Sequence, residues 1–155
     1  MGQQHQDSAA QAATELSSHG AIMETVTHRP PNAEVQELTG LLEQLSELRQ
    51  EEPTDEYGIL RLEESAFEQA RELLTNATLV LAAEYGAKMP YGCASTDSEG
   101  GLRIDWLRSD RAVNLVIPAA NQKPSYLYHE LGPDHAAEYE VTPERLAIWL
   151  RIIDD

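Results

Sequence analysis

The sequence predicts an α+β fold with two N-terminal helices, an antiparallel meander of four or five strands and a C-terminal helix. Before Pro90, apolar residues recur at the three- and four-residue spacing of a helix, and after it they recur at every second position, as in strands. Thr142-Pro143-Glu144-Arg145 then marks the start of the last helix, because threonine caps helices and proline is tolerated at the first helical position.

The composition of residues 1–33 predicts a flexible arm, which precedes a single α+β domain of residues 34–155. The arm is rich in Gln, Ser, Ala and Thr and has almost no aliphatic cluster, so it has little apolar surface to bury. Pro30-Pro31 ends the arm, since the residue before a proline is pushed out of the α region. The total of 155 residues is a one-domain length with room for such a tail.

The first helix is expected over residues 33–50, with Asn32 as its cap. Its apolar residues follow one helical stripe: Val35, Leu38, Leu41, Leu42, Leu45 and Leu48. The glutamates fall mostly on the other side: Glu34, Glu37, Glu43 and Glu47. The leucine seam is as narrow as a coiled-coil seam but short, which favours a docked helix or a helical hairpin. This acidic leucine helix, residues 34–52, is a candidate for a detachable segment.

A loop over residues 51–58 and a second helix over residues 62–84 follow. The apolar positions of this helix include Phe67, Ala70, Leu73, Leu74, Ala77, Leu81 and Ala82. Thr75-Asn76-Ala77-Thr78 is a poor helix-forming patch, so an early stop near Asn76 is the alternative to the continuous helix that we expect. Gly86 suits the left-handed residue that ends many helices.

The predicted strands cover residues 91–96, 102–107, 113–117 and 125–131, with a possible fifth at 136–141. Leu102, Ile104 and Trp106 alternate with other residues, which is typical of a sheet with one apolar face. Asp97-Ser98-Glu99-Gly100-Gly101 and Gly132-Pro133-Asp134 supply turn residues. In the last helix, the expected buried stripe is Leu146, Trp149, Leu150 and Ile153.

Residues 57–153 resemble a group of small, largely uncharacterised bacterial proteins. The shared features are a Gly-rich turn before a strand ending in Trp, an Arg-led strand and a Tyr-rich strand. In this chain they are Gly100-Gly101-Leu102-Arg103-Ile104-Asp105-Trp106, Arg111-Ala112-Val113-Asn114-Leu115-Val116-Ile117 and Tyr126-Leu127-Tyr128. The resemblance implies a compact, antitoxin-like accessory protein and no established activity.

The charge is strongly negative, with a net value of −16 from 27 acidic and 11 basic residues. Residues 34–56 are the most acidic stretch, because they hold eight acids and one base. Such a charge disfavours direct binding to nucleic acid or anionic membranes and favours a basic protein partner. Cys93 is the single cysteine, no apolar run reaches about 18 residues, and the N-terminal residues do not predict a signal peptide. We therefore expect a cytoplasmic protein.

The nearest approach to a reactive cluster is His129-Glu130 followed by His135, with Asp134 and Glu138 nearby. Zincin chemistry needs two histidines four residues apart on one helix, whereas here the gap is six and Gly132-Pro133 would break a helix. No phosphate-binding glycine motif occurs. The sequence therefore predicts no catalytic residue, no metal site and no cofactor.

The leading hypothesis is an acidic, non-enzymatic interaction protein that binds a basic protein partner, as an antitoxin, inhibitor or adaptor does. Its candidate partner-binding residues all lie on the first helix: Leu38, Leu41, Leu45, Leu48, Glu37, Glu43 and Glu47. One alternative is a structural subunit that forms a homodimer through the same leucines. Another is a hydrolase with a site assembled over residues 129–138.

Overall fold

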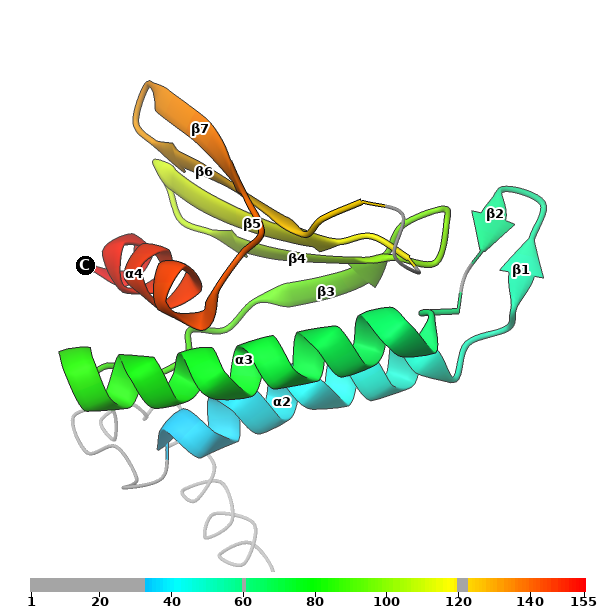
Figure 1. The fold of residues 1–155 in the computed structure, drawn as a ribbon, viewed down its shortest axis with the longest axis horizontal. Coiled ribbons are helices and arrows are strands. Elements are labelled where there is room, and N and C mark those ends of the chain that lie inside the picture. The colour runs from blue at the N-terminus through cyan, green and yellow to red at the C-terminus, as the bar shows by residue number, and fades with distance from the viewer. Residues whose placement is uncertain (1–32, 60, 120–122) are drawn as a thin grey trace, which may run out of the picture. The chain divides into compact units, whose positions relative to one another are not determined.

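The computed structural model describes residues 33–59, 61–119 and 123–155, so residues 1–32 of the predicted arm lie outside the described residues. It confirms an α+β protein with a five-stranded antiparallel sheet and a C-terminal helix (Figure 1). Within the described part, no helix is both long enough and apolar enough to cross a membrane.

The described elements follow one another in a simple order. Helix α2 (Ala33–Arg49), the short strands β1 (Thr54–Asp55) and β2 (Gly58–Ile59), and helix α3 (Glu64–Tyr85) come first. The large sheet follows, with strands β3 (Cys93–Thr96), β4 (Leu102–Leu107), β5 (Arg111–Ile117), β6 (Tyr126–Leu131) and β7 (Asp134–Tyr139). Helix α4 (Pro143–Asp154) closes the chain.

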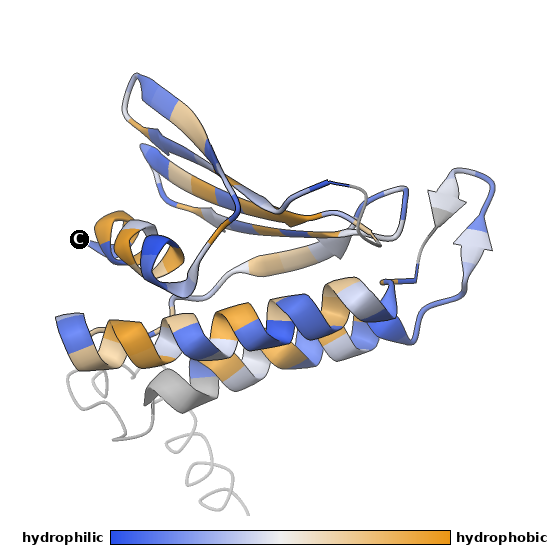
Figure 2. Cartoon of the chain, viewed as in Figure 1, coloured by the Kyte–Doolittle hydropathy of each residue, from blue (hydrophilic) through white to orange (hydrophobic). Residues whose placement is uncertain are grey.

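The five strands form a meander in the spatial order β3-β4-β5-β6-β7. The register pairs Leu102 with Ile117 and Trp106 with Val113, so the large apolar residues of β4 and β5 share one face. All four of these side chains are buried. Figure 2 shows the matching alternation of hydrophobic and hydrophilic residues along these strands. We call the buried side the inner face and the other side the outer face.

Helices α3 and α4 pack against each other and contact the inner face at β4 and β5. Helix α3 runs without a break through Thr75–Thr78, where the sequence left an early stop open. The helix continues because its Leu74, Ala77 and Leu81 are buried in the core, which outweighs the poor propensity of this patch. The buried Thr78 hydroxyl is satisfied within the helix, since it donates to the carbonyl oxygen of Leu74 at 2.8 Å. Gly86, at φ 59°, ends the helix in the left-handed conformation.

A two-stranded hairpin, β1–β2, stands within the segment predicted as a loop. Each strand has two residues, which is too short for an alternating pattern to be recognised in the sequence. Its turn is held by Asp55, whose Oδ1 accepts from the backbone N–H groups of Tyr57 at 2.8 Å and Gly58 at 3.1 Å.

Helix α4 is fixed at both ends. The Thr142 side chain accepts from the N–H of Arg145 at 3.2 Å, with Pro143 in the first turn. At the other end, Arg111 donates to the carbonyl oxygen of Ile152 at 2.6 Å, and Arg108 pairs with Asp154 at 2.8 Å. The arginines near the β4–β5 turn therefore hold the C-terminal end of α4, where a positive charge is favourable.

Candidate functional site

The predicted partner-binding residues of α2 separate into an inner and an outer group. Leu41 and Leu45 are 2% and 0% exposed and belong to the hydrophobic core, and Leu38 and Leu48 pack half-buried against it. The leucine seam is therefore covered by the protein's own domain while α2 stays in place. Of the three predicted glutamates, Glu37 is half-buried, whereas Glu43 and Glu47 are exposed.

The packing of α2 is fixed by a specific polar contact with the sheet. The Gln44 side chain donates to the carbonyl oxygen of Gly92 at 3.0 Å and accepts from the N–H of Ala94 at 2.8 Å. These two bonds join the helix to the chain at the start of β3, and together with the burial of Leu41 and Leu45 they are consistent with one rotation of α2 about its axis. That rotation turns the leucines inward and leaves Glu43 and Glu47 outward.

The exposed side of α2 carries little compensating positive charge. Neither Glu43 nor Glu47 forms an ion pair with a residue that the structure describes. Arg49 is the single basic residue of segment 34–56, and it bonds Glu64 at 3.1 Å while its guanidinium lies 3.8 Å from the centre of the Phe67 ring. The local field therefore stays negative and can attract a cationic surface.

The strand register divides the predicted histidine group between the two faces of the sheet. His129 pairs with Ala136 and is buried on the inner face, whereas His135 pairs with Glu130 and is exposed on the outer face. The ring of His135 lies 6.1 Å from that of Tyr128. Among the described residues, no three His, Cys, Asp or Glu side chains are grouped so that they could hold a metal ion.

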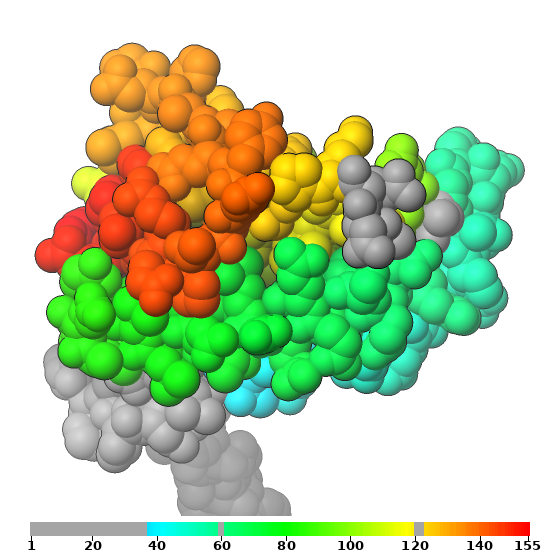
Figure 3. All heavy atoms as spheres, in the orientation of Figure 1, coloured from blue at the N-terminus to red at the C-terminus, as the bar shows by residue number. Residues whose placement is uncertain are grey.

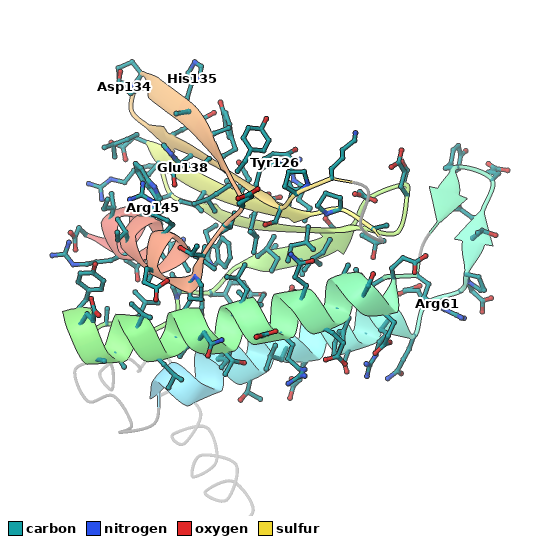
Figure 4. All side chains as sticks on the ribbon, viewed as in Figure 1. Arg61, Tyr126, Asp134, His135, Glu138 and Arg145 are labelled. Carbon is teal, nitrogen blue, oxygen red and sulfur yellow. The ribbon has the colours of Figure 1, made fainter. Side chains whose placement is uncertain are left out.

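Glu138 is the centre of the densest polar cluster that the structure describes. Its carboxylate accepts two bonds from Arg145, at 2.9 and 2.7 Å, and one from Trp149 Nε1 at 3.0 Å (Figure 4). His129 Nε2 lies 3.2 Å from the same carboxylate, and its ring stacks on Trp149 with the centroids 3.6 Å apart. The cluster joins β6 and β7 to α4.

The electrostatics of this cluster suit a structural role. The hydrogen bonds from Arg145, with those from Trp149 and His129, lower the pKa of Glu138 to about 2, against the smaller opposing effect of burial. A carboxyl group with such a pKa holds no proton near neutral pH, so it is a poor general acid. Its lone pairs are already used by three side chains. We conclude that Glu138 fixes β7 to α4.

The low pKa of Glu138 predicts how the stability of the protein depends on pH. The folded-state pKa of Glu138 lies below the unfolded value, so its stabilisation is present above pH 4.5 and is lost as the pH falls towards 2. Because the side chain is partly exposed, we expect this contribution to be about 1–2 kcal/mol. Urea unfolding should show Glu138→Gln to be less stable by that amount at pH 7 and nearly equal to wild type near pH 2. The exposed control Glu84→Gln should follow wild type throughout, and equal pH profiles for all three proteins would contradict the prediction.

The outer face of the sheet carries an aromatic row near β6 and β7. The rings of Tyr126 and Tyr139 are 5.6 Å apart, and the Tyr128 hydroxyl donates to Glu130 at 3.0 Å. The Tyr139 side chain is 66% exposed. The sequence placed Glu138 in the alternative hydrolase site over residues 129–138, but it did not predict the contacts of Glu138 with Arg145 and Trp149 or the pairing of Tyr126 with Tyr139. The signal that could have located them is the turn Gly132-Pro133, because a two-residue turn fixes which residues face each other along the hairpin.

A scan against models of protein families, a search of curated proteins and a search of solved structures each find no significant match to the chain.

Proposed function

We propose that the chain is a cytoplasmic, acidic, non-enzymatic interaction protein that binds a basic protein partner, in the manner of an antitoxin, inhibitor or adaptor. The contact is made by the exposed side of α2, with Glu43 and Glu47 at its centre. One observation carries this proposal: the leucine side of α2 is already buried, while the two glutamates are exposed and form no ion pair with a described residue. A helix in that state can meet a partner only through its polar side.

The charge of the chain supports a basic protein as the partner. With a net charge of −16, the protein repels phosphate backbones and draws cationic surfaces towards it. Complementary charges raise the association rate and suppress wrong partners more than they raise affinity. We therefore expect binding that is fast and sensitive to salt.

The packing of α2 bears on the two other hypotheses. A homodimer through the leucine seam would need Leu41 and Leu45 to leave the core, which exposes a large apolar area to water before any new contact forms. A hydrolase over residues 129–138 would have to work with histidines on opposite faces of the sheet and with Glu138 bound to Arg145. The glutamate side of α2 requires no such rearrangement.

Charge reversal on α2 tests the proposal. In a pull-down from lysate at low salt, wild type should retain a basic protein that Glu43→Lys, Glu47→Lys loses, with an affinity lower by about tenfold or more. The matched control is Glu84→Lys, Glu99→Lys, which makes the same change in net charge at two other exposed positions and should bind nearly as wild type does.

Two results would count against the proposal. The first is equal retention of the partner by the α2 variant and the control variant, which would place the contact elsewhere. The second is the recovery of no basic protein by wild type at low salt.

A further inference from the structure

Strand β7 is the last strand of the five-stranded sheet, and no strand that the structure describes pairs with its outer edge. The backbone N–H of Glu140 donates to the carbonyl oxygen of Ser125 at 2.8 Å, which continues the ladder between β6 and β7 by one further pair. Because antiparallel pairs alternate, the backbone groups of Ala136 and Glu138 point to β6, and those of His135, Ala137 and Tyr139 point away from the sheet. Among the described residues, none bonds to these three outward-pointing backbones.

At the opposite end of the sheet, the edge of β3 has hydrogen-bond partners. The edge of β3 is covered by α2, whose Gln44 side chain satisfies the carbonyl of Gly92 and the N–H of Ala94. Figure 1 shows α2 on the β3 side of the sheet and β7 at the far side, with no described helix along its edge. The side chain of Gln44 thus covers one edge of the sheet, and no residue in the described part of the chain bonds to the other.

Strand β7 carries the charges of Asp134 and the inward-facing Glu138, but it lacks three other features that protect an edge. Its sequence, Asp134-His135-Ala136-Ala137-Glu138-Tyr139, has no proline and no lysine, and its register with β6 is continuous, without a bulge. Ala136 and Ala137 are small and exposed, so another backbone can approach closely. Figure 3 shows atoms of this strand at the surface, beside those of α4.

The charges along the edge determine which occupant fits. Asp134, Glu130 and Glu140 are exposed near the strand, and the nearest cation, Arg145, is already bound by Glu138. A second copy of the chain would bring the same carboxylates together and is disfavoured. A segment with lysine or arginine at alternate positions presents these side chains to one face of the sheet, where they would pair with the carboxylates on that face, and the exposed ring of Tyr139 offers it apolar contact.

We propose that β7 accepts an extended, lysine- or arginine-rich segment of the partner protein as a sixth strand of the sheet. The backbone groups of His135, Ala137 and Tyr139 bond the segment, and the surrounding carboxylates select its basic side chains. This inference rests on the proposed function, because it assigns a second contact to the same basic partner. The α2 surface and the β7 edge are nevertheless separate and can be tested separately.

The probe is an end-capped peptide of about eight residues with alternating lysine and valine. Two control peptides are the glutamate–valine counterpart and the lysine peptide with N-methyl groups on alternate backbone nitrogens. Full-length protein should bind the lysine peptide in fluorescence anisotropy and bind both controls at least about tenfold more weakly. NMR hydrogen exchange should show that the peptide protects the amides of His135, Ala137 and Tyr139.

Two variants locate the binding on the edge. Ala137→Pro removes one outward-pointing N–H and no bond to β6, so it should lower the peptide affinity about tenfold with little change in thermal stability. Ala137→Lys keeps the N–H and adds a like charge at an exposed position, so it should weaken binding without affecting folding. Glu43→Lys, Glu47→Lys should bind this short peptide nearly as wild type does.

Several results would overturn the inference. One is equal binding of the lysine peptide to wild type and to both Ala137 variants. Another is protection of the three edge amides from hydrogen exchange in the free protein. Protection that does not depend on protein concentration would indicate that the chain covers its own edge. Protection that increases with concentration would indicate that a second copy covers it. If the edge variants fail to weaken binding while the α2 variant still loses the basic partner, the edge is excluded and the proposed function stands. If the Ala137 variants weaken peptide binding while Glu43→Lys, Glu47→Lys still retains the basic partner, the α2 contact is excluded.

Discussion

Replacing Leu45 with alanine should lower the free energy of unfolding by about 2–5 kcal/mol. The Leu45 side chain is 0% exposed and lies in the core, next to residues of α2 that pack half-buried against it. Its removal loses the transfer free energy of the deleted methyl groups and leaves a cavity that the surrounding helices can only partly fill. Urea unfolding followed by circular dichroism measures the change, with the slope of the transition as a check on two-state behaviour.

The matched control is Glu47→Ala, two residues further along the same helix on its exposed side. We expect it to change the unfolding free energy by no more than about 0.5 kcal/mol. Comparing Leu45→Ala with Glu47→Ala tests whether the leucine seam is part of the core or an intermolecular surface. If Leu45→Ala leaves stability unchanged and instead weakens partner binding or dissociates a dimer, the leucines form an intermolecular surface and the packing of α2 described above is contradicted.

Replacing Trp106 with alanine should have the largest effect on stability, a loss of about 3–5 kcal/mol. The ring is 0% exposed on the inner face of β4, and its Nε1 donates to the carbonyl oxygen of Pro90 at 3.0 Å. It is also in close contact with the backbone of Gly92, where an added Cβ would lie 2.7 Å from Nε1. The truncation therefore leaves a large cavity and an unpaired buried carbonyl group, and it loosens the chain where it enters the sheet.

Leu107→Ala is the control for Trp106, because the adjacent residue of the same strand points to the outer face. Its side chain is 63% exposed, so we expect a change within about 0.5 kcal/mol. Thermal unfolding of both variants, compared with wild type, measures the difference. Similar losses for the two variants would show that the strand does not present Trp106 to the core and Leu107 to solvent.

The strands were predictable because their signal is local. Leu102, Ile104 and Trp106 lie two residues apart, and this spacing places them on one face of any strand. The possible fifth strand exists as β7, although it begins at Asp134, two residues before the predicted start. The reason is the turn: Gly132 and Pro133 alone connect the strands, so Leu131 and Asp134 already face each other.

The polar cluster around Glu138 was not predictable from residue types. Glu138 meets His129 across the β6–β7 hairpin, and it meets Arg145 and Trp149 across the junction between the sheet and α4. The first contact depends on the strand register, and the other two depend on how α4 docks on the sheet. The strand register and the docking of α4 depend on residues far apart in the chain, so a short stretch of sequence does not reveal them. The spacing of apolar residues, in contrast, can be read from a short stretch.

By itself, the sequence determined the fold class, the alternation of inner and outer residues along the strands, and the start of the last helix at Thr142. These follow from the spacing of apolar residues and from capping residues, both of which act within a few positions. Only the tertiary structure decided what covers the leucines of α2 and which edge of the sheet stays open. An apolar stripe specifies that a helix must be buried, but the surface that buries it is supplied by residues far away in the chain: here the core beneath α2 and the β3 edge held by Gln44.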